Sequence, residues 1–239
     1  MASLIEAPLV QTKDLALHFG GLRAVDGVDF TLNPGEIHAL IGPNGAGKTT
    51  FVSLLSGRRL PQSGTIVLEG EDITRLPAHA RVRKGIAYTF QITSIFPRLT
   101  VFDNVALAVQ SHGAKDLPAK TRAALARVGL DGLEQQEAQT LSYGHQRLLE
   151  LAMGLALNPR LLILDEPTQG LAASEIDGFI RLVQSLVPAT TVLLIEHNME
   201  VVMDLATRIT VLNFGRVLAT GTPDEIRANP LVQEAYLGA

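Results

Sequence analysis

The chain has 239 residues, a formal net charge of -4 and no cysteine. Its length fits one or two domains with a sizeable core, and the lack of cysteine excludes disulfides and thiolate metal sites. The small negative charge provides no overall basic field, so we expect no nucleic-acid partner, and we interpret the basic cluster Arg75, Arg81, Arg83 and Lys84 as a solvated helix face.

Strand patterns around one helix dominate the first part of the chain. Short apolar or alternating runs predict strands at residues 9–19, 28–32, 37–41, 65–68 and 86–90. A helix is expected over residues 51–55, and a short one over about 77–84. Turn signals separate these elements at Asn33-Pro34-Gly35 and Pro61-Gln62-Ser63-Gly64.

The periodicity then changes, and residues 92–159 are predicted to be helical almost throughout. Pro118 opens one of these helices. Buried strands are expected at 161–164 and 191–195, each followed by a helix, and two more at 209–214 and 217–220. Thr222, Pro223 and Glu225 then form the capping box of a helical tail, residues 222–239. The alternation predicts one α/β domain, residues 1–239, with 92–159 as a helical subdomain.

The segment between the predicted strand at 37–41 and the helix at 51–55 has the phosphate-loop spacing, a glycine, four residues and then Gly-Lys-Thr. Its glycines let successive backbone N–H groups face one anion at the positive end of a helix dipole. We expect Lys48 to reach the β- and γ-phosphates of ATP and the Thr49 hydroxyl to hold Mg²⁺. The residues expected to contact the nucleotide are Gly42, Pro43, Asn44, Gly45, Ala46, Gly47, Lys48, Thr49 and Thr50.

A second motif follows the predicted strand at 161–164, where Asp165 and Glu166 stand together. Two carboxylates at a strand end mean little alone, but beside a phosphate loop they complete the machinery for phosphoryl transfer. We expect Asp165 to hold Mg²⁺ through water, and Glu166 to orient and deprotonate the attacking water.

The segment Leu141-Ser142-Tyr143-Gly144-His145-Gln146 heads the helix that precedes this strand. Ser142 can cap that helix, and Gly144 lets an anion approach its N-terminus. With the phosphate loop and the carboxylate pair, the segment resembles the ATP-binding subunits of ABC transporters, whose signature runs Leu-Ser-Gly-Gly-Gln. The resemblance implies a P-loop NTPase fold with an N-terminal antiparallel β subdomain and an inserted helical subdomain. It also implies that Ser142 and Gly144 close over the γ-phosphate bound to a second ATPase subunit.

Three more residues gain an expected role from this resemblance. Phe19 matches the aromatic residue that stacks on adenine, although alone it could be a core residue. Gln91 matches the glutamine that touches Mg²⁺ and water and links the site to the membrane partner. His197 matches the switch histidine that contacts the γ-phosphate.

The chain also departs from the family pattern. The family commonly ends the loop after the carboxylates with Ser-Ala-Leu-Asp, but here it reads Gln169-Gly170-Leu171-Ala172. The absent Asp removes a carboxylate that bridges to the partner, which leaves the strength and symmetry of coupling between subunits open. Tyr143 and His145 replace the usual Gly and Gln, and His145 is either merely tolerated or responds to pH at the γ-phosphate.

The form of the signature and of the tail Tyr236-Leu237-Gly238 resembles the branched-chain amino acid importers. Such importers combine two ATPase subunits with two permeases and a binding protein. We therefore expect permease partners, a homo- or heterodimer of ATPases and indirect contact with a binding protein. Relatives with similar ATPases import urea, amides or aromatic acids, so these cargoes remain alternatives. Ile92, Ile95 and Phe96 are either permease-docking residues or core residues.

The same resemblance implies a peripheral position on the cytoplasmic face of the inner membrane. The first residues lack the charged start and long apolar core of a signal peptide. The longest apolar runs fall far short of the roughly 20 residues that a membrane helix needs. Membrane contact is therefore expected through partners.

Three rival functions belong to other classes. An ABC protein of translation or chromosome maintenance usually has two cassettes or a long coiled coil between the phosphate motifs, and this chain has neither. A small-molecule kinase has no use for Ser142 and Gly144. A binding module without hydrolysis predicts loss of Lys48 or Glu166, and both are present.

Overall fold

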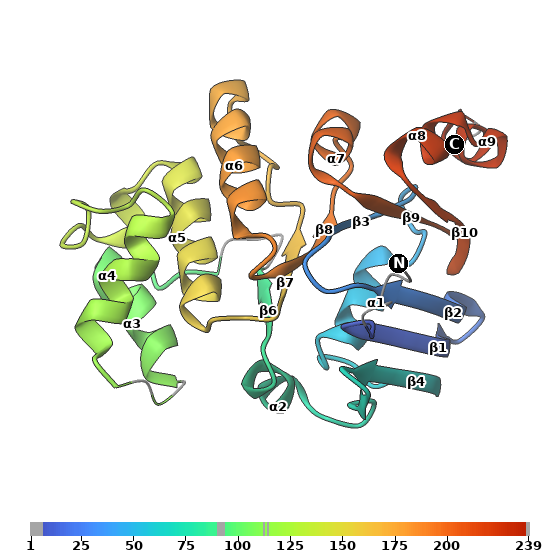
Figure 1. Ribbon diagram of the computed structural model, residues 1–239, viewed down its shortest axis with the longest axis horizontal. Helices are drawn as coiled ribbons and strands as arrows, with labels where there is room; N and C mark the ends of the chain where they lie inside the picture. The colour runs from blue at the N-terminus through green and yellow to red at the C-terminus, as the bar shows by residue number, and fades with distance from the viewer. Residues whose placement is uncertain (1–6, 90–93, 112, 114, 238–239) are drawn as a thin grey trace, which may run out of the picture.

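Two β-sheets and the helices packed on them build the structure, a computed structural model that describes residues 7–89, 94–111, 113 and 115–237 (Figure 1). In this part of the chain the larger sheet has six strands in the order β10-β9-β3-β8-β7-β6. Their bounds are β3 Ile37–Ile41, β6 Ile86–Thr89, β7 Leu161–Asp165, β8 Thr191–Ile195, β9 Arg208–Asn213 and β10 Arg216–Gly221. The smaller sheet, counted over the same residues, has the order β2-β1-β4-β5, with β1 Val10–Phe19, β2 Leu22–Leu32, β4 Ser63–Leu68 and β5 Glu71–Asp72.

Parallel pairing in the larger sheet brings the ends of its central strands together. β3 lies between β8 and β9, and β7 lies between β8 and β6, all in parallel register. Every residue of β3, β7 and β8 is buried, as uninterrupted apolar runs predict for strands covered on both faces. The carboxyl ends of these three strands therefore share one edge, where the loops that follow them can form a site.

The smaller sheet is antiparallel where β1 pairs with β2 and β4, and it packs on the larger sheet through helix α1, Lys48–Leu55. Apolar residues of α1 lie in one cluster with residues of both sheets, including Phe30 of β2 and Leu40 of β3. The rings of Phe30 and Phe51 meet edge to face with their centroids 5.2 Å apart. The helix that follows the phosphate loop is thus held by both sheets.

The remaining helices cover the larger sheet and its ends (Figure 1). Helices α3 Val101–Ser111, α4 Leu117–Arg127 and α5 Tyr143–Ala156 share an apolar cluster with α6, Ala173–Leu186, and with β7 and β8. Helices α7 Met199–Leu205, α8 Pro223–Ala228 and α9 Pro230–Leu237 pack beside β9. Among the described residues, no helix combines the length and the apolar character needed to cross a membrane.

Most predicted elements are confirmed within a few residues, including the capping box of Thr222 and Glu225. The main difference is β2, which begins at Leu22 rather than at residue 28. Polar residues interrupt its apolar pattern, but its backbone still pairs with β1 across irregularities of register. The two-residue β5 is too short to leave a pattern. The predicted strand end at Phe90 lies outside the described residues.

Helix α2, Ala78–Arg83, shows that the basic cluster is not simply a solvated face. Arg81 is fully buried, whereas Arg83 on the same helix is exposed. The Arg81 guanidinium donates hydrogen bonds to four backbone carbonyls, those of Leu54 at 2.6 Å, Leu55 at 2.9 Å, Thr74 at 3.0 Å and Leu76 at 3.0 Å. The first two belong to the last turn of α1, where carbonyls lack intrahelical partners. Burial lowers the pKa of Arg81 to about 10, so the side chain stays charged at neutral pH.

We predict that Arg81→Ala lowers the free energy of unfolding by about 2–4 kcal/mol, because several buried carbonyls lose a charged donor. Arg83→Ala is the matched control, with an expected change within about 0.5 kcal/mol. Urea unfolding followed by circular dichroism measures both values. Equal effects of the two substitutions would show that the buried guanidinium does not stabilise the fold.

Candidate phosphate and carboxylate site

The predicted phosphate loop connects β3 to α1 and is closely packed on both sides. A Cβ on Gly42 would lie 2.1 Å from the carbonyl oxygen of Leu212, and one on Gly47 would lie 2.0 Å from that of Ala24. Both glycines also have positive φ, 151° and 100°. Only glycine fits these two positions, because any side chain would overlap backbone atoms and strain the loop.

Lys48 folds back over this loop. Its Nζ donates hydrogen bonds to the carbonyl oxygens of Gly42, at 2.6 Å, and Pro43, at 3.1 Å. Partial burial lowers the pKa of Lys48, and the nearby carboxylates of Glu166 and Asp165 oppose that shift. The ammonium group therefore lies above the loop, close to the second motif.

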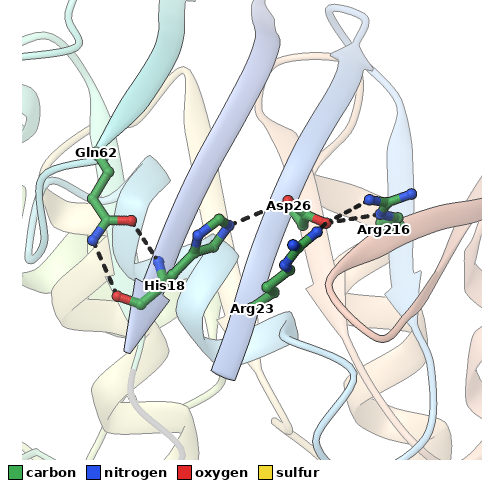
Figure 2. Close-up of polar contacts among 5 residues, drawn as sticks. All are labelled: His18, Arg23, Asp26, Gln62 and Arg216. Atoms are coloured by element: carbon green, nitrogen blue, oxygen red, sulfur yellow. Dashed lines mark hydrogen bonds and ion pairs between the residues drawn. The ribbon is translucent and has the colours of Figure 1, made fainter. Parts of the chain in front are cut away.

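Figure 2 shows a polar network that joins the smaller sheet to Arg216, the first residue of β10 after the turn that connects β9 to β10. Asp26 of β2 accepts hydrogen bonds from Nε and Nη2 of Arg216, at 2.9 and 2.7 Å, and from Arg23 at 3.4 Å. The Nε2 atom of His18 lies 3.2 Å from Asp26 Oδ1. The hydrogen bonds from Arg216 lower the pKa of Asp26. Asp26 is thus the centre of this network.

The same turn supports the phosphate loop through its backbone. The N–H of Gly215 donates to the carbonyl oxygen of Ala46 at 3.0 Å, and the N–H of Asp26 donates to that of Gly215 at 2.8 Å. A continuous chain of hydrogen bonds therefore runs from β2 through the turn to the phosphate loop.

Phe19 ends β1, directly after His18 of this network. Its side chain is 41% exposed, so it is not a core residue. The guanidinium carbon of Arg59 lies 5.1 Å from the ring centroid. Gln62 fixes the preceding backbone, because its side chain accepts from the N–H of His18 at 2.9 Å and donates to the carbonyl of His18 at 3.1 Å. A partly exposed ring on a fixed strand end can stack on a base.

Asp165 ends β7 and Glu166 follows it, beside the carboxyl end of β8. Asp165 is buried, and its Oδ2 accepts a hydrogen bond from the Tyr88 hydroxyl at 2.6 Å. Burial raises the pKa of Asp165, partly offset by that hydrogen bond and by nearby cations. Glu166 has a positive φ of 48°, and its N–H donates to the carbonyl of Ile195 at 2.8 Å. The two neighbouring carboxyl groups thus occupy different environments.

His197 follows β8 and lies close to the second of these carboxylates. Its Nδ1 is 3.9 Å from Glu166 Oε2, and its side chain is 63% exposed. The structure therefore brings Lys48, Asp165, Glu166 and His197 to one edge of the sheet. Thr49 and Thr50 stand in the first turn of α1 at the same edge. Gln91 lies outside the described residues, as do the docking candidate Ile92 and Gly238 of the tail.

The predicted signature forms the start of α5. Ser142 caps the helix, and its Oγ accepts from the N–H of His145 at 3.2 Å. A Cβ on Gly144 would lie 2.3 Å from Oε1 of Glu175. In Figure 1, α5 lies apart from α1, with β6 and β7 between them, so the signature helix is not placed at its own phosphate loop.

Tyr143, which replaces a glycine of the family signature, contacts the loop 169–172, which also departs from the family pattern. A Cβ on Gly170 would lie 2.8 Å from the Tyr143 ring. The guanidinium carbon of Arg147 is 5.4 Å from the ring centroid. Tyr143 thus packs on the loop that follows Glu166 in the same chain.

Two residues at this edge were not identified from the sequence. Tyr88 supplies the hydroxyl that donates a hydrogen bond to Asp165. In the sequence, the only indication of this role was that a tyrosine, with its polar hydroxyl, stands in a predicted strand. Glu196 bonds the loop after Glu166, through the N–H of Thr168 at 3.0 Å. A carboxylate directly before His197 was a signal that could have found it.

Comparison with known proteins decides the family. Residues 25–169 match the family model described as ABC transporter, which is more than half of the chain. The chain belongs to the ABC transporter ATPases. A second model, described as branched-chain amino acid ATP-binding cassette transporter, matches residues 216–239. This ABC ATPase therefore binds and hydrolyses ATP as a subunit of an ABC transporter and works with permease subunits.

Named relatives span nearly the whole ABC ATPase. It is 40% identical to the high-affinity branched-chain amino acid transport ATP-binding protein BraF of Pseudomonas aeruginosa, over 97% of this chain and 98% of the relative. It is 37% identical to the lipopolysaccharide export system ATP-binding protein LptB of Escherichia coli, over 95% of each chain. A crystal structure of an ATP-binding cassette of an ABC transporter in its ADP conformation superposes with a TM-score of 0.90 at 26% identity, covering 98% of this chain and all of that one. The predicted P-loop NTPase fold of ABC ATPases is confirmed.

We predict that Gly170→Ala reduces ATP turnover several-fold, because the new methyl group displaces the Tyr143 ring in addition to straining a residue at φ 81°. Gly132→Ala is the matched control, since Gly132 has φ 88° and nothing within 4 Å of its Cβ position. Both variants should lose stability by about 1 kcal/mol from the backbone strain. Gly170→Ala with Tyr143→Ala should recover turnover; no recovery would show that the ring contact is not the cause.

The Asp26 network predicts a pH dependence of stability. Folding lowers the pKa of Asp26, so the network stabilises the fold at any pH above the pKa of the unfolded chain, about 4. This stabilisation is lost as the pH falls through the pKa of the folded protein. Wild type should therefore have a higher Tm than Asp26→Asn at about pH 5, and the margin should shrink as the pH falls below about 4. Calorimetry measures it, and a margin independent of pH would contradict the ion pairing.

Proposed function

We propose that this ABC ATPase powers the uptake of branched-chain amino acids through partner permeases at the cytoplasmic face of the inner membrane. The observation that carries the cargo is the match of residues 216–239 to the branched-chain model, at the end of the chain that a general ABC cassette model does not cover. The 40% identity to a branched-chain transport protein over nearly the full length supports it. A binding protein delivers the cargo to the permeases, and the ATPase does not touch it.

The chemistry we propose uses the residues gathered at the sheet edge. Backbone N–H groups of the phosphate loop, residues 42–50 apart from Pro43, and the Lys48 ammonium bind the phosphates of ATP. Glu166 orients the attacking water and takes its proton, and its position at a strand end beside His197 suits that role. His197 and Gln91 contact the γ-phosphate. Phe19 stacks on adenine from the end of β1.

We propose that Thr49, Gln91 and Asp165 hold Mg²⁺. The hydroxyl and carboxylate of the two described ligands are the hard oxygen donors that this ion prefers, and they follow strands that meet at one edge. Within the described residues there is no group of three or more His, Cys, Asp or Glu that could hold a metal by itself. This fits Mg²⁺, which usually binds through one or two carboxylates together with substrate phosphates and water. When bound, the ion neutralises charge on the phosphates.

A second ATPase subunit completes the site in this proposal. Ser142 and Gly144 lie at the start of α5, apart from the phosphate loop of their own chain, and this separation supports a role at nucleotide held by a partner. Binding of ATP closes the dimer, and hydrolysis followed by release opens it. The motion passes to permease loops that dock near Gln91. Phe96, which follows it in the sequence and is half-exposed, offers an apolar contact.

A second cargo is supported by a specific observation, the 37% identity to a lipopolysaccharide export ATPase. Urea, amides and aromatic acids also remain alternatives. The cargo is decided by a pull-down from native membranes with the Glu166→Gln chain and MgATP, followed by mass spectrometry. Two permeases with a second ATPase, and a binding protein encoded with them that binds leucine, isoleucine or valine, support the proposal. Permeases of lipopolysaccharide export would overturn the cargo, and ribosomes or chromatin would overturn transport.

We predict that Glu166→Gln still binds ATP and dimerises but hydrolyses it about 10²–10⁴-fold more slowly, because the amide cannot accept the proton from water. Glu200→Gln, an exposed carboxylate after β8, is the control and should keep wild-type turnover. Phosphate release measures turnover, and gel filtration with MgATP measures dimerisation. Undiminished hydrolysis in Glu166→Gln would remove this residue as the base.

A further inference from the structure

Glu196 is a carboxylate buried at the carboxyl end of β8, with an exposed fraction of 1%. Its Oε1 accepts hydrogen bonds from the N–H of Thr168, at 3.0 Å, and from the Thr168 hydroxyl. Its Oε2 accepts from the N–H groups of His197, at 3.0 Å, and Asn198, at 3.2 Å. One buried side chain thus receives four donors from two loops.

The two loops are those that carry the groups proposed to act on the γ-phosphate. Thr168 lies two residues after Glu166, and His197 is the residue directly after Glu196. The N–H of Glu166 also donates to the carbonyl of Ile195 at 2.8 Å, so the loops start from adjacent strand ends. His197 Nδ1 lies 3.9 Å from Oε2 of Glu166 and 3.9 Å from Oε2 of Glu196. Glu196 therefore bridges the loop of the base and the loop of the switch histidine.

The donors explain why this position suits a glutamate. A buried carboxylate is costly unless its oxygens are matched by donors, and here each oxygen accepts two. Glutamine has nearly the same shape, but its NH₂ group would face a backbone N–H donor whichever way the amide turned, that of Thr168 on one side or those of His197 and Asn198 on the other. Replacing Glu196 by glutamine should therefore release one of the two loops while leaving the size of the side chain unchanged.

We propose that Glu196 is a positioning residue for ATP hydrolysis, which fixes Glu166 relative to His197 by joining their loops. The inference rests on the roles proposed above for these two residues. It requires no contact between Glu196 and ATP. Because the phosphate loop and Phe19 lie on other elements, a loss of the bridge should slow the chemical step and leave binding of ATP nearly unchanged. This separation distinguishes positioning from a general loss of structure.

The first experiment compares Glu196→Gln with Glu36→Gln as a matched control. Glu36 is also a carboxylate with several hydrogen bonds, since it accepts from the backbone N–H and the Nδ2 of Asn33 and lies 3.1 Å from His38 Nδ1. It precedes β3, however, and so lies at the opposite end of that strand from the phosphate loop. We expect kcat of Glu196→Gln to fall by on the order of 10²-fold, the loss typical of a misplacement near 1 Å, with the Kd of a fluorescent ATP analogue within about twofold of wild type. Glu36→Gln should lose stability but keep kcat.

The second experiment uses a milder change for the case in which Glu196→Gln fails to fold. Thr168→Val removes only the hydroxyl donor, and Thr168→Ser keeps it. We expect a several-fold lower kcat for the valine variant, recovery in the serine variant and an unchanged Kd in both. Wild-type kcat in folded Glu196→Gln, or in Thr168→Val where the former is unfolded, overturns the inference. So does a parallel loss of kcat and ATP affinity.

The outcomes also separate this inference from the proposed function. If Glu166→Gln hydrolyses ATP normally, the assignment of the base fails, whatever the Glu196 variants do. If Glu166→Gln is inactive and Glu196→Gln is fully active, the base assignment stands and only the positioning role of Glu196 is lost. Calorimetry on every variant records whether it is folded at the assay temperature.

Discussion

The parallel pairing of β3, β7 and β8 is the constraint on which the rest of this structure depends. Three fully buried strands that run in the same direction must end at the same edge, so the loops after them are forced together. Lys48 follows the first strand, Glu166 the second and His197 the third. Hydrophobic burial, which itself has no direction, thereby assembles a polar site from residues far apart in the chain.

The edge is then made rigid by hydrogen bonds that differ in kind from those of the sheet. The carbonyl of Ile195 fixes the backbone of Glu166, the Tyr88 hydroxyl fixes the side chain of Asp165, and the Glu196 carboxylate fixes Thr168 and His197. The contacts of Ile195 with Glu166, of Tyr88 with Asp165 and of Glu196 with Thr168 each join two different strands or the loops after them. The loops that carry the site are therefore tied to one another by hydrogen bonds within this chain.

Much of this site could be predicted from the sequence, because its residues lie at fixed positions in short motifs that follow apolar strands. A glycine-rich loop between an apolar strand and a helix, and carboxylates after another apolar strand, place Lys48, Asp165 and Glu166 without any structure. The contacts around them were not predictable, because they join residues distant in sequence: Tyr88 and Asp165 are 77 residues apart, and Thr168 and Glu196 are 28 apart. The same holds in the fold outside the site, where Arg81 and Leu54 are 27 apart. Nothing in a local pattern distinguishes a buried arginine such as Arg81 from its exposed neighbour Arg83.

The close approach of the Ala24 and Leu212 carbonyls to Gly47 and Gly42 has a consequence for engineering. A peptide of residues 37–55 contains the whole phosphate-loop sequence, yet the walls that press the loop into its curve come from β2 and β9, on two different sheets. Outside this setting the glycines are free to take many conformations, and ordering them around an anion costs conformational entropy. The loop is therefore not a transferable module, and grafting it onto another scaffold requires carrying over both walls as well.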